Sequence, residues 1–262
     1  IRLYGYPISP SEIADLMLPP SCSDFIALDG EGLDIGSGGG QPYMVGTNNY
    51  VYKWNECARN WGLFAASPAA SRIDVDGEGN PWITATDQKI YRWNGSAFQQ
   101  LPGAAVEIGV SGNTVFVANA DGNLYQFNGS SWTGFSKPAF VSRVDVREGQ
   151  PWIVTQDNSV YQYLESNWLI QGEFQAKDIS VSDKDDSIYV LSTTGVASVY
   201  VGSGSYKPLC ASNGANISVG NEGNIWVVQT SNNLLRMLDC DAVGNTVASN
   251  GSCDSGTMLM ET

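Results

Sequence analysis

Large aromatic residues recur along this chain at a nearly constant interval. Successive members of the first set are 39, 34, 36, 37 and 37 residues apart: Tyr43, Trp82, Phe116, Trp152, Tyr189 and Trp226. Eleven positions after each of them comes a second large apolar residue: Trp54, Trp93, Phe127, Tyr163, Tyr200 and Met237. The chain therefore contains six copies of one unit, and a period of this size is typical of stacked or circular repeat folds.

One of these units, Ile73–Gly103, shows what is repeated. It contains short runs of β-branched and aromatic residues separated by a glycine-rich turn at 76–80, a polar break at 87–88 and an Asn-Gly-Ser turn at 94–96. Such runs, bounded by turn residues, predict β-strands, and no part of the unit has the period or the length of a helix. One four-stranded antiparallel sheet in each of six units predicts an all-β protein folded as a six-bladed β-propeller.

Propeller blades pack face to face, so both aromatic columns are interpreted as core. Each unit also opens with a short alternating run that we expect nearest the central channel: Leu33-Asp34-Ile35, Ile73-Asp74-Val75, Ile108-Gly109-Val110, Val144-Asp145-Val146, Ile179-Ser180-Val181 and Ile217-Ser218-Val219. In this alignment Asp34, Asp74 and Asp145 share one position. Three carboxylates could bind Ca²⁺ there, but a solvated ring is the simpler explanation, and we predict no metal site and no cofactor.

The sixth unit has no aromatic residue in its outer strand, whereas the other five units have one: Trp61, Phe98, Trp132, Trp168 and Tyr206. This difference falls where a propeller closes its ring. Closure commonly borrows a strand from the opposite end of the chain, because an unpaired strand edge promotes aggregation. Two segments can supply that strand, 23–27 near the N-terminus and 257–260 near the C-terminus.

The units follow a common pattern of Ile-x-Val, a glycine-rich turn, an aromatic strand, and then Ile/Leu-Tyr-x-Trp/Phe-Asn-Gly-x-x-Trp/Phe. The pattern is clearest in Ile108–Gly134 (IGVSGNTVFVANADGNLYQFNGSSWTG) and in Ile73–Gly103. It resembles the tectonin repeat over about residues 33–243. The fifth unit departs from it most, because Ser198 replaces the usual tyrosine and residues 201–204 replace the Asn-Gly turn.

The resemblance implies a six-bladed propeller that binds glycans or bacterial surface components, as tectonins and the related horseshoe-crab and fish-egg lectins do. We therefore expect a non-enzymatic, lectin-like protein that recognises glycans or cell-surface components through its blade-connecting loops. The alternative is a structural or interaction subunit of an extracellular assembly without lectin activity. The glycine-rich loops of the six units differ, which argues against six equal sites: SGGGQ, DGEGN, SGN, REGQ, SDKDDS and GNEGN.

Two asparagines are candidate ligand-binding residues. Asn94 and Asn128 begin identical Asn-Gly-Ser turns in neighbouring units, and their side chains have no packing role in the predicted blades. Hairpin formation by itself is the stronger explanation of this sequence, because Asn-Gly is the preferred two-residue hairpin turn.

Composition narrows the classes of function. The chain has 13 Lys and Arg against 27 Asp and Glu, a net charge of −14, which is unfavourable for binding nucleic acid. No apolar stretch has the length of a membrane span. Histidine is absent, which removes the commonest general base and the commonest metal ligand. We therefore expect a protein without enzymatic activity that binds a glycan or a protein surface and can assemble with other chains.

Five cysteines are present, and four of them lie in the predicted hairpin insertions or near the ends of the chain: Cys22, Cys57, Cys240 and Cys253. Cysteines in such places suggest disulfides and a secreted protein. Connectivity cannot be deduced from sequence, and the pairing we expect is Cys22–Cys57 and Cys240–Cys253. Cys210 corresponds to a strand position and is interpreted as a buried thiol. In the C-terminal tail, Asn250 is the candidate glycosylation site.

The N-terminal residues 1–22 lie outside the repeats. Ser9-Pro10-Ser11-Glu12 reads as a capping box with proline at the first helical position, and Pro19-Pro20 would end the helix. We expect a short helix docked on the rim of the propeller, because so short a helix is marginal alone. The chain then divides into this segment and a propeller with a C-terminal tail over residues 23–262.

Overall fold

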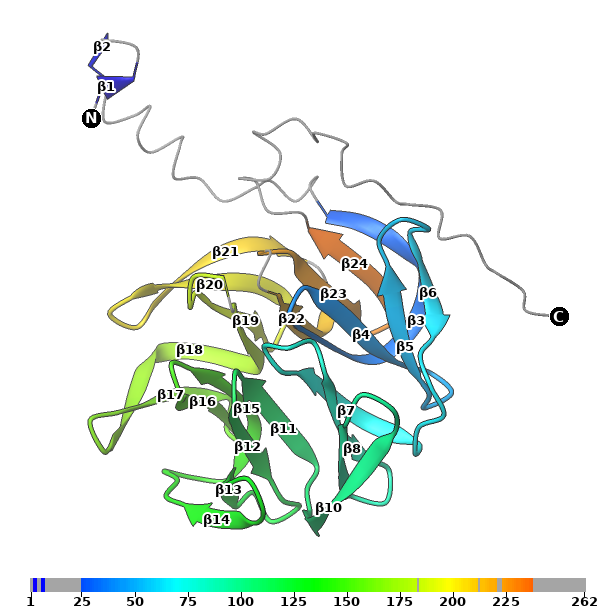
Figure 1. Ribbon diagram of the computed structural model, residues 1–262. Coiled ribbons are helices and arrows are strands. Elements are labelled where there is room, and N and C mark those ends of the chain that lie inside the picture. Colours follow the sequence, from blue (N-terminus) through cyan, green and yellow to red (C-terminus); the bar gives the residue numbers. More distant parts are fainter. Residues whose placement is uncertain are drawn as a thin grey trace, which may run out of the picture.

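The computed structural model in Figure 1 describes residues 2–3, 6–7, 25–182, 184–211, 213–220 and 223–237, with the side chains of 2–3, 6–7, 210–211 and 235–237 left aside. Every regular element among these residues is a β-strand, and every pairing is antiparallel. The all-β prediction is confirmed. The helix predicted between Ser9 and Pro19, and the division of the chain after residue 22, lie outside the described residues.

The strands follow the six sequence units, apart from a separate hairpin of β1 (Arg2–Leu3) and β2 (Tyr6–Pro7). Unit 1 contains the second half of β3 (Phe25–Gly38), β4 (Gln41–Gly46), β5 (Val51–Asn55) and β6 (Asn60–Leu63). Unit 2 contains β7 (Ala70–Val75), β8 (Pro81–Ala85), β9 (Lys89–Trp93) and β10 (Phe98–Ala104). Unit 3 contains β11 (Glu107–Ser111), β12 (Thr114–Ala118), β13 (Leu124–Phe127) and β14 (Trp132–Phe135).

Units 4 to 6, the second half of the ring, each contain four strands in the same order. Unit 4 contains β15 (Val141–Arg147), β16 (Gln150–Thr155), β17 (Ser159–Leu164) and the first half of β18 (Asn167–Val181). Unit 5 contains the second half of β18, β19 (Ile188–Ser192), β20 (Val196–Gly202) and β21 (Ser205–Ala211). Unit 6 contains β22 (Gly214–Val219), β23 (Ile225–Gln229), β24 (Asn233–Met237) and the first half of β3.

Two long strands each belong to two units, which joins four of the units into two seven-stranded sheets. In β18, residues 167–175 pair with β17 and residues 176–181 pair with β19. In β3, residues 25–31 pair with β24 and residues 32–38 pair with β4. The N-terminal end of β3 thus covers the edge of the last unit, and of the two strand donors considered from the sequence, the N-terminal one is confirmed.

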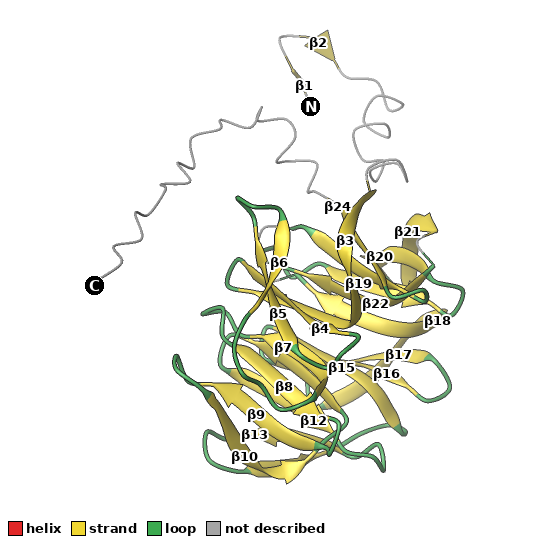
Figure 2. Ribbon diagram, turned by 90° about the vertical axis from the view of Figure 1, so that its right-hand side faces the viewer, coloured by secondary structure: helices red, strands yellow, loops and turns green. Residues whose placement is uncertain are grey.

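The innermost strands of the units meet around a common axis. Each of β3, β7, β11, β15, β18 and β22 contacts the next, and β22 contacts β3 again. Figure 1 views this arrangement along the axis, with β10, β14 and β21 at the periphery, and Figure 2 views it from the side. The described strands therefore form a closed ring of sheets around a centre.

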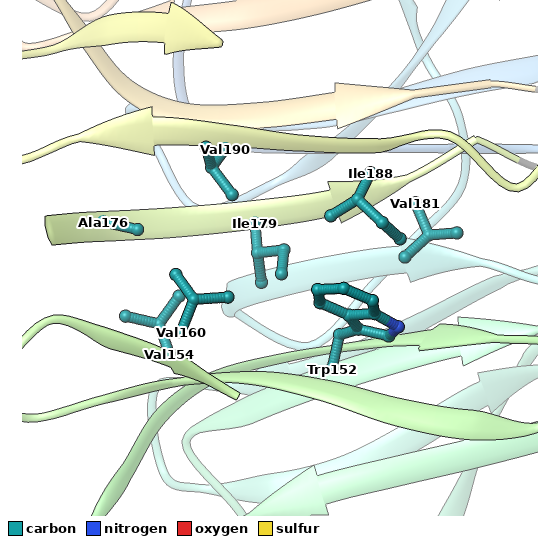
Figure 3. Close-up of a cluster of buried hydrophobic side chains, with 8 residues drawn as sticks. All are labelled: Trp152, Val154, Val160, Ala176, Ile179, Val181, Ile188 and Val190. Carbon is teal, nitrogen blue, oxygen red and sulfur yellow. The ribbon is translucent and has the colours of Figure 1, made fainter. Parts of the chain in front are cut away.

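Each contact between neighbouring units is a separate hydrophobic cluster. Figure 3 shows the one between units 4 and 5, where Trp152 lies against Ile179 and Val181 of β18. Five further clusters join the other neighbouring pairs in the same way. Because β-branched residues fit a pleated, buried surface, the valines and isoleucines that predicted strands also form these contacts.

The first aromatic column is core, as predicted. Five of its members are buried, and Tyr189 is half-buried. The second column corrects the sequence interpretation, because Trp54 is buried whereas four members are only half-buried: Trp93, Phe127, Tyr163 and Tyr200. Adjacent sheets that radiate from an axis diverge toward the rim, so the side chains of the third strand are less covered than those of the second.

The strand register also corrects the alignment of the first unit. Asp74 pairs with Trp82 and Asp145 pairs with Trp152, but the residue that pairs with Tyr43 is Gly36. Asp34 therefore lies two residues earlier than Asp74 and Asp145, and the three aspartates do not share one position. The cause is spacing in the sequence: Asp34 stands nine residues before Tyr43 and Asp145 stands seven before Trp152, although units 1 and 4 both turn through two residues (39–40 and 148–149).

Candidate functional site: two equivalent pockets between units

Two pockets open at equivalent places in the ring. The one between units 2 and 3, about 400 Å³ in volume, is lined by Asp76, Trp82, Arg92, Gly112, Asn113, Phe127, Asn128 and Gly129. The one between units 6 and 1 is about 500 Å³, and its lining includes Gly40, Gln41, Lys53, Trp54, Asn55, Glu56, Asn224 and Trp226. Trp226 holds the strand position of Trp82, and Trp54 holds that of Phe127. We refer to them as the 2/3 pocket and the 6/1 pocket.

The order of turn lengths around the ring explains where these pockets open. In each case a five-residue loop of one unit, 76–80 or 220–224, is followed by a two-residue turn of the next, 112–113 or 39–40. The two long loops have the same internal hydrogen bonds, since the first residue donates to the carbonyl of the fifth and the fourth donates to that of the first. Among the described turns, this order of long then short occurs at these two interfaces.

Both long loops contain the sequence Glu-Gly-Asn-x-Trp. It is Glu78-Gly79-Asn80-Pro81-Trp82 in unit 2 and Glu222-Gly223-Asn224-Ile225-Trp226 in unit 6. Gly79 and Gly223 have φ of 82° and 75°, a conformation that favours glycine. The six glycine-rich loops do not share one sequence, but two of them share this motif. A search for residues repeated in all six loops therefore misses it.

Asp76 organises the polar side of the 2/3 pocket. Its buried carboxylate accepts hydrogen bonds from the backbone N–H of Asn80 at 2.9 Å and from Trp82 Nε1 at 3.2 Å. Arg92 Nη2 lies 3.7 Å from the same carboxylate, and its guanidinium lies 4.9 Å from the Trp82 ring centroid. A guanidinium held in this way by a carboxylate and an indole ring presents hydrogen-bond donors to the pocket.

Aromatic rings form the apolar side of both pockets. In the 6/1 pocket the ring centroids of Trp54 and Trp226 are 5.5 Å apart, and Trp61 packs against both. In the 2/3 pocket the centroids of Trp82 and Phe127 are 5.8 Å apart, with Trp132 beside Phe127. Polar groups beside aromatic surfaces are the usual composition of a small-molecule site.

The 6/1 pocket differs from the 2/3 pocket in its polar groups. Trp54 Nε1 donates to Glu56 Oε2 at 2.5 Å. Lys53, which holds the strand position of Gln126 in unit 3, lies with its ammonium 5.5 Å from the Tyr43 ring centroid. The pockets are therefore alike in framework and different in the groups that a ligand would meet.

A hydrogen bond crosses the neighbouring interface between units 1 and 2. The Tyr43 hydroxyl donates to the Gly79 carbonyl at 3.2 Å. Burial, reinforced by Asp76, raises the pKa of Tyr43 to about 12, so this hydroxyl stays a donor at neutral pH. The long loop of unit 2 is thus held on one side by unit 1 while its other side faces the 2/3 pocket.

Both candidate asparagines lie in exposed hairpin turns. Asn94 Oδ1 accepts from the backbone N–H groups of Ser96 at 3.0 Å and Ala97 at 2.9 Å. Asn128 Oδ1 accepts from Ser130 at 3.1 Å and Ser131 at 2.8 Å. Both side chains therefore stabilise their own turns, and Asn128 also lines the 2/3 pocket.

Of the predicted disulfide cysteines, the structure describes Cys57 alone. It lines the 6/1 pocket and is disulfide-bonded. Cys22, Cys240 and Cys253 lie outside the described residues, as does Asn250, so the pairing and the glycosylation site stay predictions. Cys210 lies in β21 opposite Ala197, which matches the pairing of Leu101 with Ile90 in unit 2.

Charged side chains meet at the axis of the ring, one residue from each unit at the same register level: Asp34, Arg72, Glu107, Arg143, Asp178 and Asn216. Arg72 lies 3.6 Å from Asp34 and 3.3 Å from Glu107, and Arg143 lies 3.0 Å from Glu107 and 3.2 Å from Asp178. This axial ring is a chain of ion pairs with alternating sign.

Asp34 and Asp178 are the acids at the two ends of this series of ion pairs, and burial is the main cause of their pKa shifts. It raises the pKa of Asp34 to about 7 and that of Asp178 to about 6, although Arg72 and Arg143 respectively oppose it. Both carboxylates also join adjacent units, since Asp34 accepts from the backbone N–H of Ile73 at 2.8 Å and Asp178 accepts from that of Ile217 at 2.8 Å. The axial ring therefore holds innermost strands together.

Comparison with known proteins supports a family and a fold. Residues 69–241 match the family model described as Tectonin domain. No curated protein matches the chain. Among solved structures, a gluconolactonase from Xanthomonas campestris superimposes with a TM-score of 0.66 at 9% identity, over 82% of this chain and 89% of that one. The WD40 repeats of RRP9 give 0.60 at 11% identity, over 84% and 99%. At such identities the likeness concerns the propeller fold alone.

A streptogramin B lyase structure is also similar, with a TM-score of 0.56 at 13% identity over 84% of this chain and 89% of that chain.

None of the described residues belongs to a helix with the length and hydrophobicity that a membrane crossing requires.

Proposed function

The chain belongs to the tectonin family, and on that basis we propose that it is a non-enzymatic, lectin-like binding protein that recognises glycans through the 2/3 and 6/1 pockets. The observation that carries this proposal is the equivalence of the two pockets. Residues at equivalent positions line both of them, among them Trp82 and Trp226, and an aromatic cluster forms one side of each. A site built twice from different copies of a repeat argues for a shared ligand class.

In this proposal each unit is one blade of a six-bladed propeller. The cyclic contacts of the innermost strands and the six inter-unit clusters support this count. The seven-stranded sheets are then pairs of blades that share β18 or β3.

The chemistry of the pockets suits a sugar. Carbohydrate rings have apolar C–H faces and a rim of hydroxyl groups, which match an aromatic surface beside hydrogen-bonding side chains. In the 2/3 pocket, Arg92 is the donor and the Trp82–Phe127 pair is the apolar surface. Two sites on one rigid ring gain avidity on a surface that carries many copies of a glycan.

Composition supports the absence of catalysis and an extracellular location. The chain has no histidine, so proton transfer would rest on carboxylates. In the two pockets Asp76 and Glu56 each accept a hydrogen bond from a tryptophan indole, a structural use of those groups. Cysteine placement is the support for secretion.

A glycan array with the full chain tests the proposal. Arg92→Ala should weaken binding about 10- to 150-fold at the 2/3 pocket, since a charge-assisted hydrogen bond contributes about 1.5–3 kcal/mol. Gln126→Ala is the matched control, because Gln126 holds the same strand position in unit 3. Equal loss in both variants, or no glycan bound by folded protein, would contradict a lectin.

One observation favours the alternative of an interaction subunit. Leu164 and Leu169 lie on the same face of the β17–β18 hairpin and are 42% and 44% exposed. Exposed apolar side chains at a rim are typical of protein contacts. If the glycan array is negative, loss of self-association or partner binding in Leu169→Ser would support this second function.

A further inference from the structure

Asp76 determines how the 2/3 pocket presents its donor. One carboxylate oxygen of Asp76 lies 3.7 Å from Arg92 Nη2 and accepts a hydrogen bond from Trp82 Nε1 at 3.2 Å. All three residues line the pocket. A change in the position of Asp76 would therefore move the guanidinium that a ligand meets.

Hydrogen bonds join Asp76 to the rest of loop 76–80. The Gly79 N–H donates to the Asp76 carbonyl at 2.9 Å, and the Asp76 N–H donates to the Asn80 carbonyl at 3.0 Å. The Asp76 carboxylate also accepts from the backbone N–H groups of Glu78 at 3.1 Å and Asn80 at 2.9 Å. Because the loop is one hydrogen-bonded turn, a displacement of Gly79 is passed on to Asp76.

Unit 1 holds Gly79 in place. Gly79 is buried and lies in the loop between β7 and β8, so the pairing of these strands does not satisfy its carbonyl. The Tyr43 hydroxyl donates to that carbonyl at 3.2 Å, and the Tyr43 side chain is only 2% exposed. A Cβ added to Gly39 would collide with the Gly79 backbone nitrogen. Backbone contact and a buried hydrogen bond from unit 1 thus fix the outer side of the loop.

The first aromatic column contains a hydroxyl group in two units. Tyrosine stands there in units 1 and 5, as Tyr43 and Tyr189, whereas the other four units have Trp or Phe. Units 1 and 5 each precede a unit with a five-residue loop, 76–80 or 220–224. Since Trp and Phe fill the equivalent space in the other units, packing alone does not require the Tyr43 hydroxyl.

We propose that Tyr43 is a positioning residue of the 2/3 pocket. It does not line the pocket, and it acts through Gly79 on Asp76 and so on the guanidinium of Arg92. Three consecutive units thus assemble the pocket, and unit 1 sets ligand affinity at a site between units 2 and 3. The effect on affinity rests on the proposed lectin function, whereas the effect on the loop does not.

Tyr43→Phe tests the proposal without a ligand. The variant keeps the ring but leaves the buried Gly79 carbonyl unpaired, so loop 76–80 should open more often. Hydrogen exchange at the Gly79 N–H and the Trp82 indole N–H, followed by NMR, should accelerate about 2- to 10-fold, the factor for one net hydrogen bond. The Gly223 N–H makes the equivalent bond in unit 6 and should keep its rate. Unchanged exchange, or equal acceleration in both loops, would overturn the proposal.

Tyr52→Phe is the matched control. It removes the hydroxyl of another tyrosine of unit 1, which accepts from Asn48 Nδ2 at 2.8 Å and lines neither pocket. Exchange in loop 76–80 should be the same in this variant as in the unmodified chain. If Tyr52→Phe loosens the loop as much as Tyr43→Phe does, the Tyr43 hydroxyl has no specific role.

Titration with the methyl glycosides of glucose, galactose and mannose tests the consequence for binding. Tyr43→Phe should weaken binding about 2- to 10-fold at the Trp82 indole resonance, which reports on the 2/3 pocket, and leave it unchanged at the Trp54 indole resonance, which reports on the 6/1 pocket. Equal affinity changes at the two pockets would contradict a positioning role. If no probe shifts either resonance, the lectin function fails, and hydrogen exchange alone decides the role of Tyr43.

The unmodified chain offers a direct measurement if Tyr43→Phe does not fold. A buried hydroxyl that donates to a carbonyl exchanges slowly with water, so the Tyr43 hydroxyl proton should give its own NMR signal, with a nuclear Overhauser contact to loop 76–80. A Tyr43 hydroxyl proton in fast exchange with water would refute the proposal.

Discussion

Gly109→Ala tests whether the ring depends on direct contact between innermost strands. Gly109 lies in β11, and a Cβ added there would be 2.4 Å from the Val144 carbonyl oxygen and 2.8 Å from the Asp145 Cα of the next unit. Ordinary contacts between carbon and a carbonyl oxygen are about 3.3–3.6 Å. Because the obstructing atoms are backbone, β11 and β15 would have to separate by roughly 1 Å.

The cost follows from overpacking. Extra methyl groups in a well-packed interior typically cost about 1–3 kcal/mol. In a domain of this size each kcal/mol lowers Tm by about 2–4 °C, so a decrease of roughly 2–12 °C is expected. The change in unfolded-state entropy from Gly to Ala, about 0.4–1 kcal/mol in the stabilising direction, reduces the decrease slightly.

Gly134→Ala is the matched control. Gly134 lies in the outer strand β14, and a Cβ there meets no atom within 4 Å. Its Tm should equal or slightly exceed that of the unmodified chain. Circular dichroism melts of the three proteins decide the question, and equal melting temperatures for Gly109→Ala and Gly134→Ala would refute close backbone contact at the axis.

Two further predictions concern the axis and the aromatic columns. Stability should fall as pH rises from about 4 to about 7, because Asp34 and Asp178 have folded-state pKa values above the ordinary 3.8. The folded state therefore holds protons that the unfolded chain releases. Asp34→Asn should flatten this decrease in melts across that pH range, and a parallel pH profile in the variant would contradict the assignment. Phe116→Ala should cost about 3–5 kcal/mol in urea unfolding, because Phe116 is fully buried. Trp93→Ala should cost less, because Trp93 is half-buried, and the reverse order would contradict the difference between the two columns.

Local sequence predicted the content of each unit well. Short runs of Val, Ile and aromatic residues between Gly and Asn turns specify strands, and the six Trp, Tyr and Phe residues of the first column recur because each fills an equivalent space between sheets. The N-terminal closing strand was one of two candidates, because an unpaired edge must be covered but either end of the chain can reach it.

It was harder to predict which residues of different units hold equivalent positions and how far each lies from the axis of the ring. Asp34 looked equivalent to Asp74 because both stand in an apolar-Asp-apolar triplet, but Asp34 lies nine residues before Tyr43, and the pairing across the two-residue turn of unit 1 places Gly36 opposite Tyr43. For the second column, sequence spacing identified Trp93 as recurrent but did not reveal how far from the axis it lies, which determines its exposure.

What the sequence determined by itself is therefore the repeated unit: its strands, its turns and its buried aromatic residues, all specified by neighbours within a few positions. Only the tertiary structure decided which side chains of different units meet. Asp34 and Ile73 are 39 residues apart and bond directly, and Arg92 and Asn128 line one pocket from separate units. Such meetings depend on turn lengths, strand register and the closure of the ring. These act between units, whereas a repeat pattern in sequence describes one unit at a time.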